Sequence, residues 1–416
     1  MLFNLIDDTK AAFNYFTVTF AYWSFTLTDG AIRMLVVLYF HQLGYSPLQI
    51  AMLFLFYELF GVITNFVGGW LGSHFGLNRT MHAGMLLQIF ALAMLTVPES
   101  WLSVAYVMCA QALSGIAKDL NKMSAKASVK LMLPEGKEGK LFKLVSFLTG
   151  SKNTIKGIGF FIGGLLLSLV GFQTSLFILA SGLFIVFIFS FIFLPTELGK
   201  AKSKIKFKHL FSKDRAINQL SAARVFLFAA RDIWFVVALP LYFSSELGWD
   251  NSEVGSFFAF WIIGYGMVQS LAPRIIRWKN KPLDADSAPD GSTAQLWAGI
   301  LLVELVAMTV LLSQDVKPEW VVVGGLIVFA FIFAINSAVH SYLILSYSSK
   351  ENVAVDVGFY YMANAAGRLT GTVLSGWIYQ KWGLEACLWW STSFILATVL
   401  ISSKLPVQKQ LLSRES

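Results

Sequence analysis

Ionisable side chains inside long apolar segments are the residues of this sequence whose types and spacing could support chemistry. Asp29 and Arg33 lie four residues apart in one such segment, and Arg231 and Asp232 are neighbours in another. A charge near the middle of a membrane-spanning helix costs about 2.5 kcal/mol or more, so it normally faces a cavity or a partner. We therefore expect these four residues to form ion pairs that close a gate, or to take part in binding and coupling.

Basic side chains outnumber acidic ones among the charges expected at mid-depth. The basic residues are Arg33, Lys118, Lys122, Lys152, Lys156, Arg231 and Arg368. The acidic residues are Asp29, Asp119 and Asp232. Such a surplus in a low dielectric is unstable without an anion. Arginine forks and lysine point charges suit phosphate-like oxyanions, so we expect a site for a multiply charged organic anion.

Further polar residues extend this prediction. Asn153 follows Lys152 directly, and four secondary candidates lie in the apolar segments, namely Asn121, Asn336, His340 and Asn364. The three aspartates are candidates for coupling or gating, because protonation would release their paired cations to the substrate. Glu58 and Glu304 are further carboxylates whose facing the sequence leaves open. Lys126, Lys130 and Lys143 are expected to extend to the lipid headgroups, and Arg224 could do the same.

The composition excludes a soluble protein. Of the 416 residues, 56% are hydrophobic and only 13% are charged, whereas a soluble domain has about 25% charged residues. The two cysteines lie in apolar runs and provide neither a disulfide scaffold nor a metal site. We find no phosphate-binding loop, zinc-protease motif or Ser/His/Asp arrangement. The sequence therefore predicts no enzyme, no metal site and no cofactor, and its first residues do not resemble a cleaved signal peptide.

The apolar segments predict an all-α membrane protein with twelve transmembrane helices. Their approximate ranges are 13–41, 47–72, 80–97, 101–131, 139–170, 172–194, 215–245, 250–274, 294–313, 319–348, 352–381 and 385–404. The predicted organisation is a six-helix half at 1–195, a basic linker at 196–214, a second six-helix half at 215–405 and a tail at 406–416.

Basic residues are concentrated in loops that lie on one side of these helices. The linker and the loop at 277–293 share that side with the basic tail, and the opposite loops contain little beyond Lys317 and Lys381. The positive-inside rule then places both termini in the cytoplasm. Nucleic-acid binding by the lysine-rich linker is the disfavoured alternative, because a membrane-adjacent loop explains its charge.

The two halves resemble each other. Residues 39–45 end the first helix and residues 242–249 end the seventh with related sequences, and glycines recur in helices five and eleven. Parallel repeats of this kind are typical of the major facilitator fold. Residues 69–79 resemble the major facilitator loop signature, with Ser73 in place of its aspartate. Residues 159–164 resemble the G-P-x-x-G-G motif of antiporters, with Phe160 in place of the proline.

Four longer strings resemble the ArsJ family of organoarsenical efflux permeases. They occupy residues 22–30, 113–126, 148–153 and 230–240, so they run through both halves. The resemblance implies efflux of 1-arseno-3-phosphoglycerate, an arsenate-resistance role and a functional partnership with glyceraldehyde-3-phosphate dehydrogenase. The motif at 159–164 favours an antiporter, and we further expect a monomer in the lipid bilayer of the bacterial inner membrane.

Our leading hypothesis is proton-coupled alternating access, with the substrate held near mid-membrane where the halves meet. The lysines at 118, 122, 152 and 156 would bind one acidic end of the substrate, and the arginines at 33, 231 and 368 the other. An organophosphate/phosphate exchanger is the alternative transport function. A phosphate-ester sensor that does not transport is the alternative from a different class.

Overall fold

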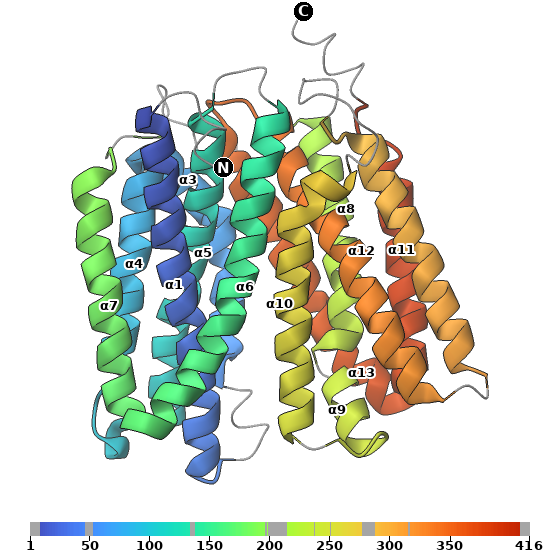
Figure 1. Cartoon of the computed structure of the whole chain (residues 1–416), viewed down its shortest axis with the longest axis horizontal. Helices are drawn as coiled ribbons and strands as arrows, with labels where there is room; N and C mark the ends of the chain where they lie inside the picture. Colours follow the sequence, from blue (N-terminus) through green and yellow to red (C-terminus); the bar gives the residue numbers. More distant parts are fainter. Residues whose placement is uncertain are drawn as a thin grey trace, which may run out of the picture. The chain divides into compact units, whose positions relative to one another are not determined.

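The described part of this computed structural model is built from helices alone (Figure 1). It comprises residues 9–45, 53–133, 138–195, 198, 214–236, 238–249, 251–276, 288–314 and 317–407. The α-helices are α1 (Thr9–Gln42), α3 (Leu55–Phe75), α4 (Leu77–Met94), α5 (Val104–Leu131), α6 (Glu138–Val170), α7 (Phe172–Phe193), α8 (Arg215–Phe235), α9 (Ala238–Ser245), α10 (Asn251–Ile276), α11 (Gly291–Leu312), α12 (Pro318–Tyr347) and α13 (Val353–Ser402).

These helices confirm the predicted all-α class. Helices α8 and α9 together cover the seventh predicted segment. Helix α13 covers the last two predicted segments, which are separated at Gly383, where φ is 76° and ψ is −171°. The predicted linker lies outside the described residues except for Leu198 and Asp214, and so does the predicted tail except for Pro406 and Val407.

Some helix ends differ from the prediction for local reasons. Helix α5 begins at Val104 rather than at 101, because Glu99–Trp101 forms a 3-10 turn. The Ser103 side chain then accepts a hydrogen bond from the Tyr106 amide and caps the helix. Helix α4 begins directly after Gly76, three residues before the predicted start. The number of helices was therefore easier to predict than their ends.

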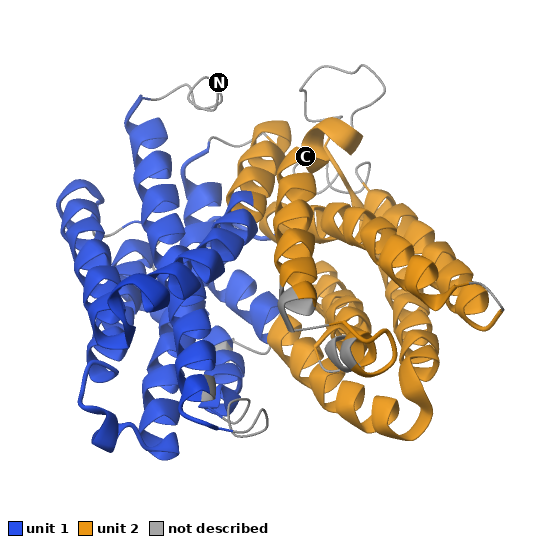
Figure 2. Cartoon of the chain, turned by 60° about the horizontal axis from the view of Figure 1, so that its bottom comes forward, with its two compact units in different colours: residues 1–135, 151–212, 348–362 blue, residues 136–150, 213–347, 363–416 orange. Residues whose placement is uncertain are grey.

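The chain forms two compact units, coloured separately in Figure 2. Unit 1 comprises residues 1–135, 151–212 and 348–362, and unit 2 comprises 136–150, 213–347 and 363–416. Helices α6 and α13 therefore each contribute to both units. The predicted halves at 1–195 and 215–405 differ from these units by two short exchanged stretches, and that division stays a prediction.

Five helices of the described residues are long and apolar enough to cross a membrane by length and composition, namely α6, α7, α11, α12 and α13. Helix α7 is apolar all round, and its Ile185 and Ile192 side chains are exposed. In a membrane protein this surface contacts lipid tails. By contrast, α5 carries five charged residues after its apolar start, which explains why hydropathy alone does not select it.

The predicted internal repeat is visible at the ends of α1 and α9. Each is followed within three residues by a glycine with positive φ, 84° at Gly44 and 71° at Gly248, a conformation that suits glycine. The Tyr45 amide donates to the Phe40 carbonyl (3.1 Å), and the Trp249 amide donates to the Phe243 carbonyl (2.9 Å). Related sequences thus produce similar helix endings in both units.

Candidate functional site

Close packing of α1 against α6 positions the first group of charges in unit 1. A Cβ atom on Gly30 would lie 2.7 Å from the Lys156 carbonyl oxygen, and one on Gly159 would lie 2.5 Å from that of Leu27. Only glycine permits such an approach of the two backbones. This approach sets Lys156 opposite Asp29.

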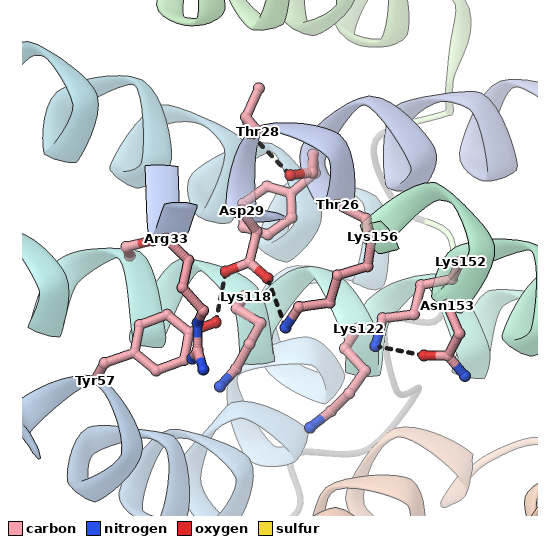
Figure 3. Close-up of polar contacts among 12 residues, drawn as sticks. Thr26, Thr28, Asp29, Arg33, Tyr57, Lys118, Lys122, Lys152, Asn153 and Lys156 are labelled. Atoms are coloured by element: carbon pink, nitrogen blue, oxygen red, sulfur yellow. Dashed lines mark hydrogen bonds and ion pairs between the residues drawn. The ribbon is translucent and has the colours of Figure 1, made fainter. Parts of the chain in front are cut away.

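Side chains of two neighbouring helices contact the Asp29 carboxylate. The Tyr57 hydroxyl of α3 donates to Asp29 Oδ1 (2.5 Å), and Lys156 Nζ of α6 lies 3.4 Å from Oδ2. The Asp29 side chain is only 3% exposed. Figure 3 shows Arg33, Lys118 and Lys156 extending into the same region around the Asp29–Tyr57 pair. Asp29 is thus the carboxylate around which unit 1 gathers its cations.

Arg33 pairs with Glu58 of α3 rather than with Asp29. Its guanidinium lies 3.2 Å from Glu58 Oε1 and 4.6 Å from the centre of the Tyr57 ring. Asp29 and Arg33 thus make their close ion pairs with residues of neighbouring helices rather than with each other. The contact also settles the facing of Glu58, which the sequence left open.

Helix α5 brings a second buried carboxylate and its lysines to this group. Asp119 is 2% exposed, with Lys122 Nζ 2.5 Å from Oδ1 and Lys118 Nζ 3.7 Å from Oδ2. Lys118 also lies 3.9 Å from the centre of the Tyr57 ring, a cation–π distance. The lysine stripe of α5 therefore reaches the region around Asp29.

Two residues of α5 depart from the sequence interpretation. Lys126 is buried and donates to the Tyr361 hydroxyl of α13 instead of extending to the headgroups. Asn121 donates to the Met81 carbonyl of α4 (3.3 Å), so it belongs to the α4–α5 packing and not to the lysine stripe.

Helix α6 adds Lys152 and Asn153, whose side chains lie 3.4 Å apart. Ser151, the preceding residue, accepts a hydrogen bond from Trp23 Nε1 of α1 (2.8 Å). Lys152 lies one turn before Lys156 on the same face, as the four-residue spacing predicts. We name the group in unit 1 the α1–α6 basic cluster, defined as Asp29, Arg33, Glu58, Lys118, Asp119, Lys122, Lys152 and Lys156.

Unit 2 has a comparable arrangement at Asp232. The Arg231 guanidinium lies 2.5 Å from Asp232 Oδ1, and Arg368 Nε of α13 lies 3.0 Å from Oδ2. A Cβ on Gly367 would be 2.3 Å from the Val225 carbonyl oxygen, so α8 and α13 also pack backbone to backbone. The predicted Arg231–Asp232 pair is present, with Arg368 as a third member.

Arg224 lies on the same face of α8 as Arg231, seven residues earlier, and was not among the predicted site residues. It is 3% exposed, and its Nε donates to Asn364 Oδ1 (2.9 Å) while NH1 donates to Ser337 Oγ (3.2 Å). Arg224 is therefore buried among polar partners and does not extend to the headgroups. The seven-residue spacing to Arg231 is a sequence signal that could have identified it.

The remaining secondary candidates are buried without hydrogen bonds among the described residues. Neither the Asn336 amide nor the His340 imidazole of α12 has a partner there. Both carboxylate oxygens of Glu304 in α11 are likewise buried and unbonded. Tyr57 and Tyr361 contact the lysines, and nothing in the sequence distinguishes them from ordinary packing aromatics. The described residues contain no group of three or more His, Cys, Asp and Glu side chains that could hold a metal ion.

The comparisons define the class of protein. The sequence model of the Major Facilitator Superfamily matches residues 18–338, more than half of the chain. The chain belongs to this superfamily. It is therefore a multi-pass membrane protein that transports a small substrate across a lipid bilayer, and it is not an enzyme.

Solved structures share the fold at low sequence identity. A bacterial homologue of the iron transporter ferroportin in its outward-facing state has a TM-score of 0.73 at 15% identity, covering 94% of this chain and 98% of its own. The human organic anion transporter MFSD10 gives 0.72 at 16%, with coverage of 93% and 98%. The E. coli fucose:proton symporter gives 0.71 at 12%, with coverage of 95% and 100%. A search of curated protein sequences found no significant match.

Proposed function

We propose that this protein transports a multiply charged organic anion by proton-coupled alternating access. The observation that carries the proposal is the charge balance of the α1–α6 basic cluster, in which five basic side chains surround three carboxylates. Cations in a low dielectric need counter-charges, and a di- or polyanionic substrate provides them. Asp232 with Arg231 and Arg368 gives unit 2 a positive balance of its own.

The substrate class follows from the residue types. Lysine ammonium groups and planar arginine guanidinium groups bind phosphate-like oxyanions with charge-assisted hydrogen bonds. In our proposal Lys118, Lys122, Lys152 and Lys156, with Asn153, bind one end of the anion. Arg33, Arg231 and Arg368 bind the other acidic group.

The resemblance to the ArsJ family supports a specific substrate, 1-arseno-3-phosphoglycerate, which has acidic groups at both ends. The protein would export this product of glyceraldehyde-3-phosphate dehydrogenase acting on arsenate and so confer arsenate resistance. We place it in the bacterial inner membrane as a monomer with both termini in the cytoplasm. Protons exchanged at Asp29, Asp119 and Asp232 would drive the efflux as antiport.

Arsenate resistance of cells tests the site and the substrate together. Cells that carry Lys118→Ala or Arg231→Ala at normal expression should lose resistance. Lys381→Ala is the matched control, because Lys381 lies over the rings of Trp377 and Trp382. It belongs neither to the α1–α6 basic cluster nor to the ion pairs at Asp232. Full resistance both of cells that carry Lys118→Ala and of cells that carry Arg231→Ala would refute the site assignment.

Reconstituted vesicles distinguish the alternatives. An organophosphate/phosphate exchanger, which the same basic residues could serve, would take up glycerol 3-phosphate in exchange for internal phosphate. A phosphate-ester sensor would bind without flux. Export of the organoarsenical with no phosphate exchange is the result expected from our proposal.

A further inference from the structure

A buried polar cluster in unit 2 lies outside the ion pairs described above. It is formed by α8, α12 and α13, and we name it the His340 cluster. Its members are Arg224, Asn336, Ser337, His340 and Asn364. All five are at most 8% exposed. His340 lies four residues after Asn336 and three after Ser337, so the three α12 members share one face of that helix.

The Arg224 guanidinium is held in a fixed orientation within this cluster. Asn364 and Ser337 accept hydrogen bonds from two of its nitrogens, and its Cζ atom lies 3.9 Å from the centre of the Phe228 ring. Its positive charge acts on the His340 imidazole. The cluster therefore has a positioned cation beside the histidine.

Asn336 and His340 present buried polar atoms that the described residues leave unsatisfied. Both side chains are 0% exposed, and neither the two amide atoms nor the two ring nitrogens have a hydrogen-bond partner. Buried polar groups in folded proteins are nearly always hydrogen-bonded, and an unmade bond is costly. Two such residues one turn apart, beside a positioned arginine, point to a ligand or to buried water.

The chemistry of these groups favours one kind of ligand. A primary amide and a neutral imidazole can each donate one hydrogen bond and accept another. A hydroxyl group can accept a hydrogen bond from one member of this pair and donate to the other, whereas a fully ionised oxyanion only accepts. Arg224 adds the charge that an anion requires. We propose that the His340 cluster binds the hydroxyl-bearing part of the transported anion and selects hydroxylated substrates. This inference rests on the proposed transport of organic anions.

Binding of two matched probes tests this inference. Glycerol 3-phosphate carries two hydroxyl groups, and n-propyl phosphate has the same charge and carbon chain without them. The full-length protein in lipid nanodiscs should bind glycerol 3-phosphate about tenfold or more tightly, because a site built for a hydroxyl rejects the analogue that lacks it. Isothermal titration gives both affinities.

Variants assign the preference to the cluster. Asn336→Leu and His340→Leu should each abolish the preference while leaving the affinity for n-propyl phosphate unchanged. Their thermal stability should be equal or higher, because an apolar side chain replaces an unsatisfied polar one. Thr309→Val is the control, since the buried Thr309 hydroxyl already donates to the Leu305 carbonyl (2.6 Å). It should retain the preference.

The other outcomes are decisive. Equal affinity of the unaltered protein for the two probes would overturn the inference and leave the proposed function standing. A preference that survives in both leucine variants, accompanied by lower stability, would identify a structural water site instead and overturn the inference as well. Binding of neither probe would refute the proposed function, and with it this inference.

Discussion

Asp29 and Asp232 occupy equivalent positions in the repeated sequence. They are 203 residues apart, and the same distance separates Tyr39 from Tyr242. Each aspartate forms an ion pair with a basic residue of the helix packed against it, Lys156 in unit 1 and Arg368 in unit 2. A buried carboxylate that neutralises a cation of the neighbouring helix is therefore part of the repeat.

Replacing either aspartate should be strongly destabilising. Asp232→Asn leaves Arg231 and Arg368 without their carboxylate, and breaking a buried pair in this way costs about 3–5 kcal/mol. A melting curve of the purified protein measures the loss, and phosphate should recover part of it. The exposed Glu99, which accepts from the Tyr39 hydroxyl (3.4 Å), provides the control variant Glu99→Gln. Equal losses in both variants would contradict this account.

Tyr57 combines two contacts that a pair of variants can separate. Tyr57→Phe removes the hydroxyl that donates to Asp29 but keeps the ring beneath Lys118 and Arg33. Hydrogen bonds to charged groups contribute about 1.5–3 kcal/mol, so we expect a loss of that size. Tyr57→Leu removes the ring as well and should lower stability further, by about 0.5–2 kcal/mol. Equal melting temperatures of the two variants would show that the ring contacts contribute nothing.

At the scale of the helices, glycine contacts bring the charged groups together. Gly163 of α6 faces the Ala31 carbonyl of α1, and Gly371 of α13 faces the Ala229 carbonyl of α8. Helix α6 thus packs on α1 as α13 packs on α8. The recurring glycines noted in the sequence are therefore packing positions, and the ion pairs at Asp29 and Asp232 depend on them.

Adjacent glycines in α6 provide a matched test of this packing. A Cβ on Gly163 would lie 2.5 Å from the Ala31 carbonyl oxygen, whereas one on Gly164 would meet nothing closer than 3.7 Å. Gly163→Ala should therefore destabilise the protein by about 1–3 kcal/mol through overpacking. Gly164→Ala should be neutral or slightly stabilising, because alanine favours helix. If both substitutions have the same effect on the melting temperature, α1 and α6 do not pack backbone to backbone at Gly163 and Ala31.

The sequence predicted the helices, most of the charged residues and the Arg231–Asp232 pair, but not the partners that lie on other helices. Hydropathy and charge patterns depend on residues close in the chain, so the twelve segments and the α5 lysine stripe could be predicted from the sequence. The pairing of Arg33 with Glu58 depends on how α1 and α3 are rotated against each other, which no local pattern reports. The same holds for Arg224, which can extend to lipid or hydrogen-bond to Asn364 depending on the position of α13.

For the whole molecule, the fold constrains the transported ligand less than the side chains do. The chain shares its architecture with a homologue of an iron transporter and with sugar and organic anion transporters. A fold of this kind accommodates many substrates, so specificity has to be argued from the site. The carboxylates near the middle of the helices are already paired with lysine and arginine side chains. A divalent cation would have to displace these partners.

We therefore expect polyvalent anions, and not divalent metal ions, to stabilise the purified protein. A ligand at about a hundred times its dissociation constant adds about 2.7 kcal/mol to the stability of the folded state. Phosphate, sulfate and glycerol 3-phosphate should raise the melting temperature above that in chloride of the same ionic strength, which controls for screening. Fe²⁺ should leave it unchanged, because the described residues have no cluster of metal-ligating side chains. Stabilisation by Fe²⁺ and not by the anions would contradict the proposed positive charge of the site. Other carboxylates would then have to compensate the surplus of basic residues.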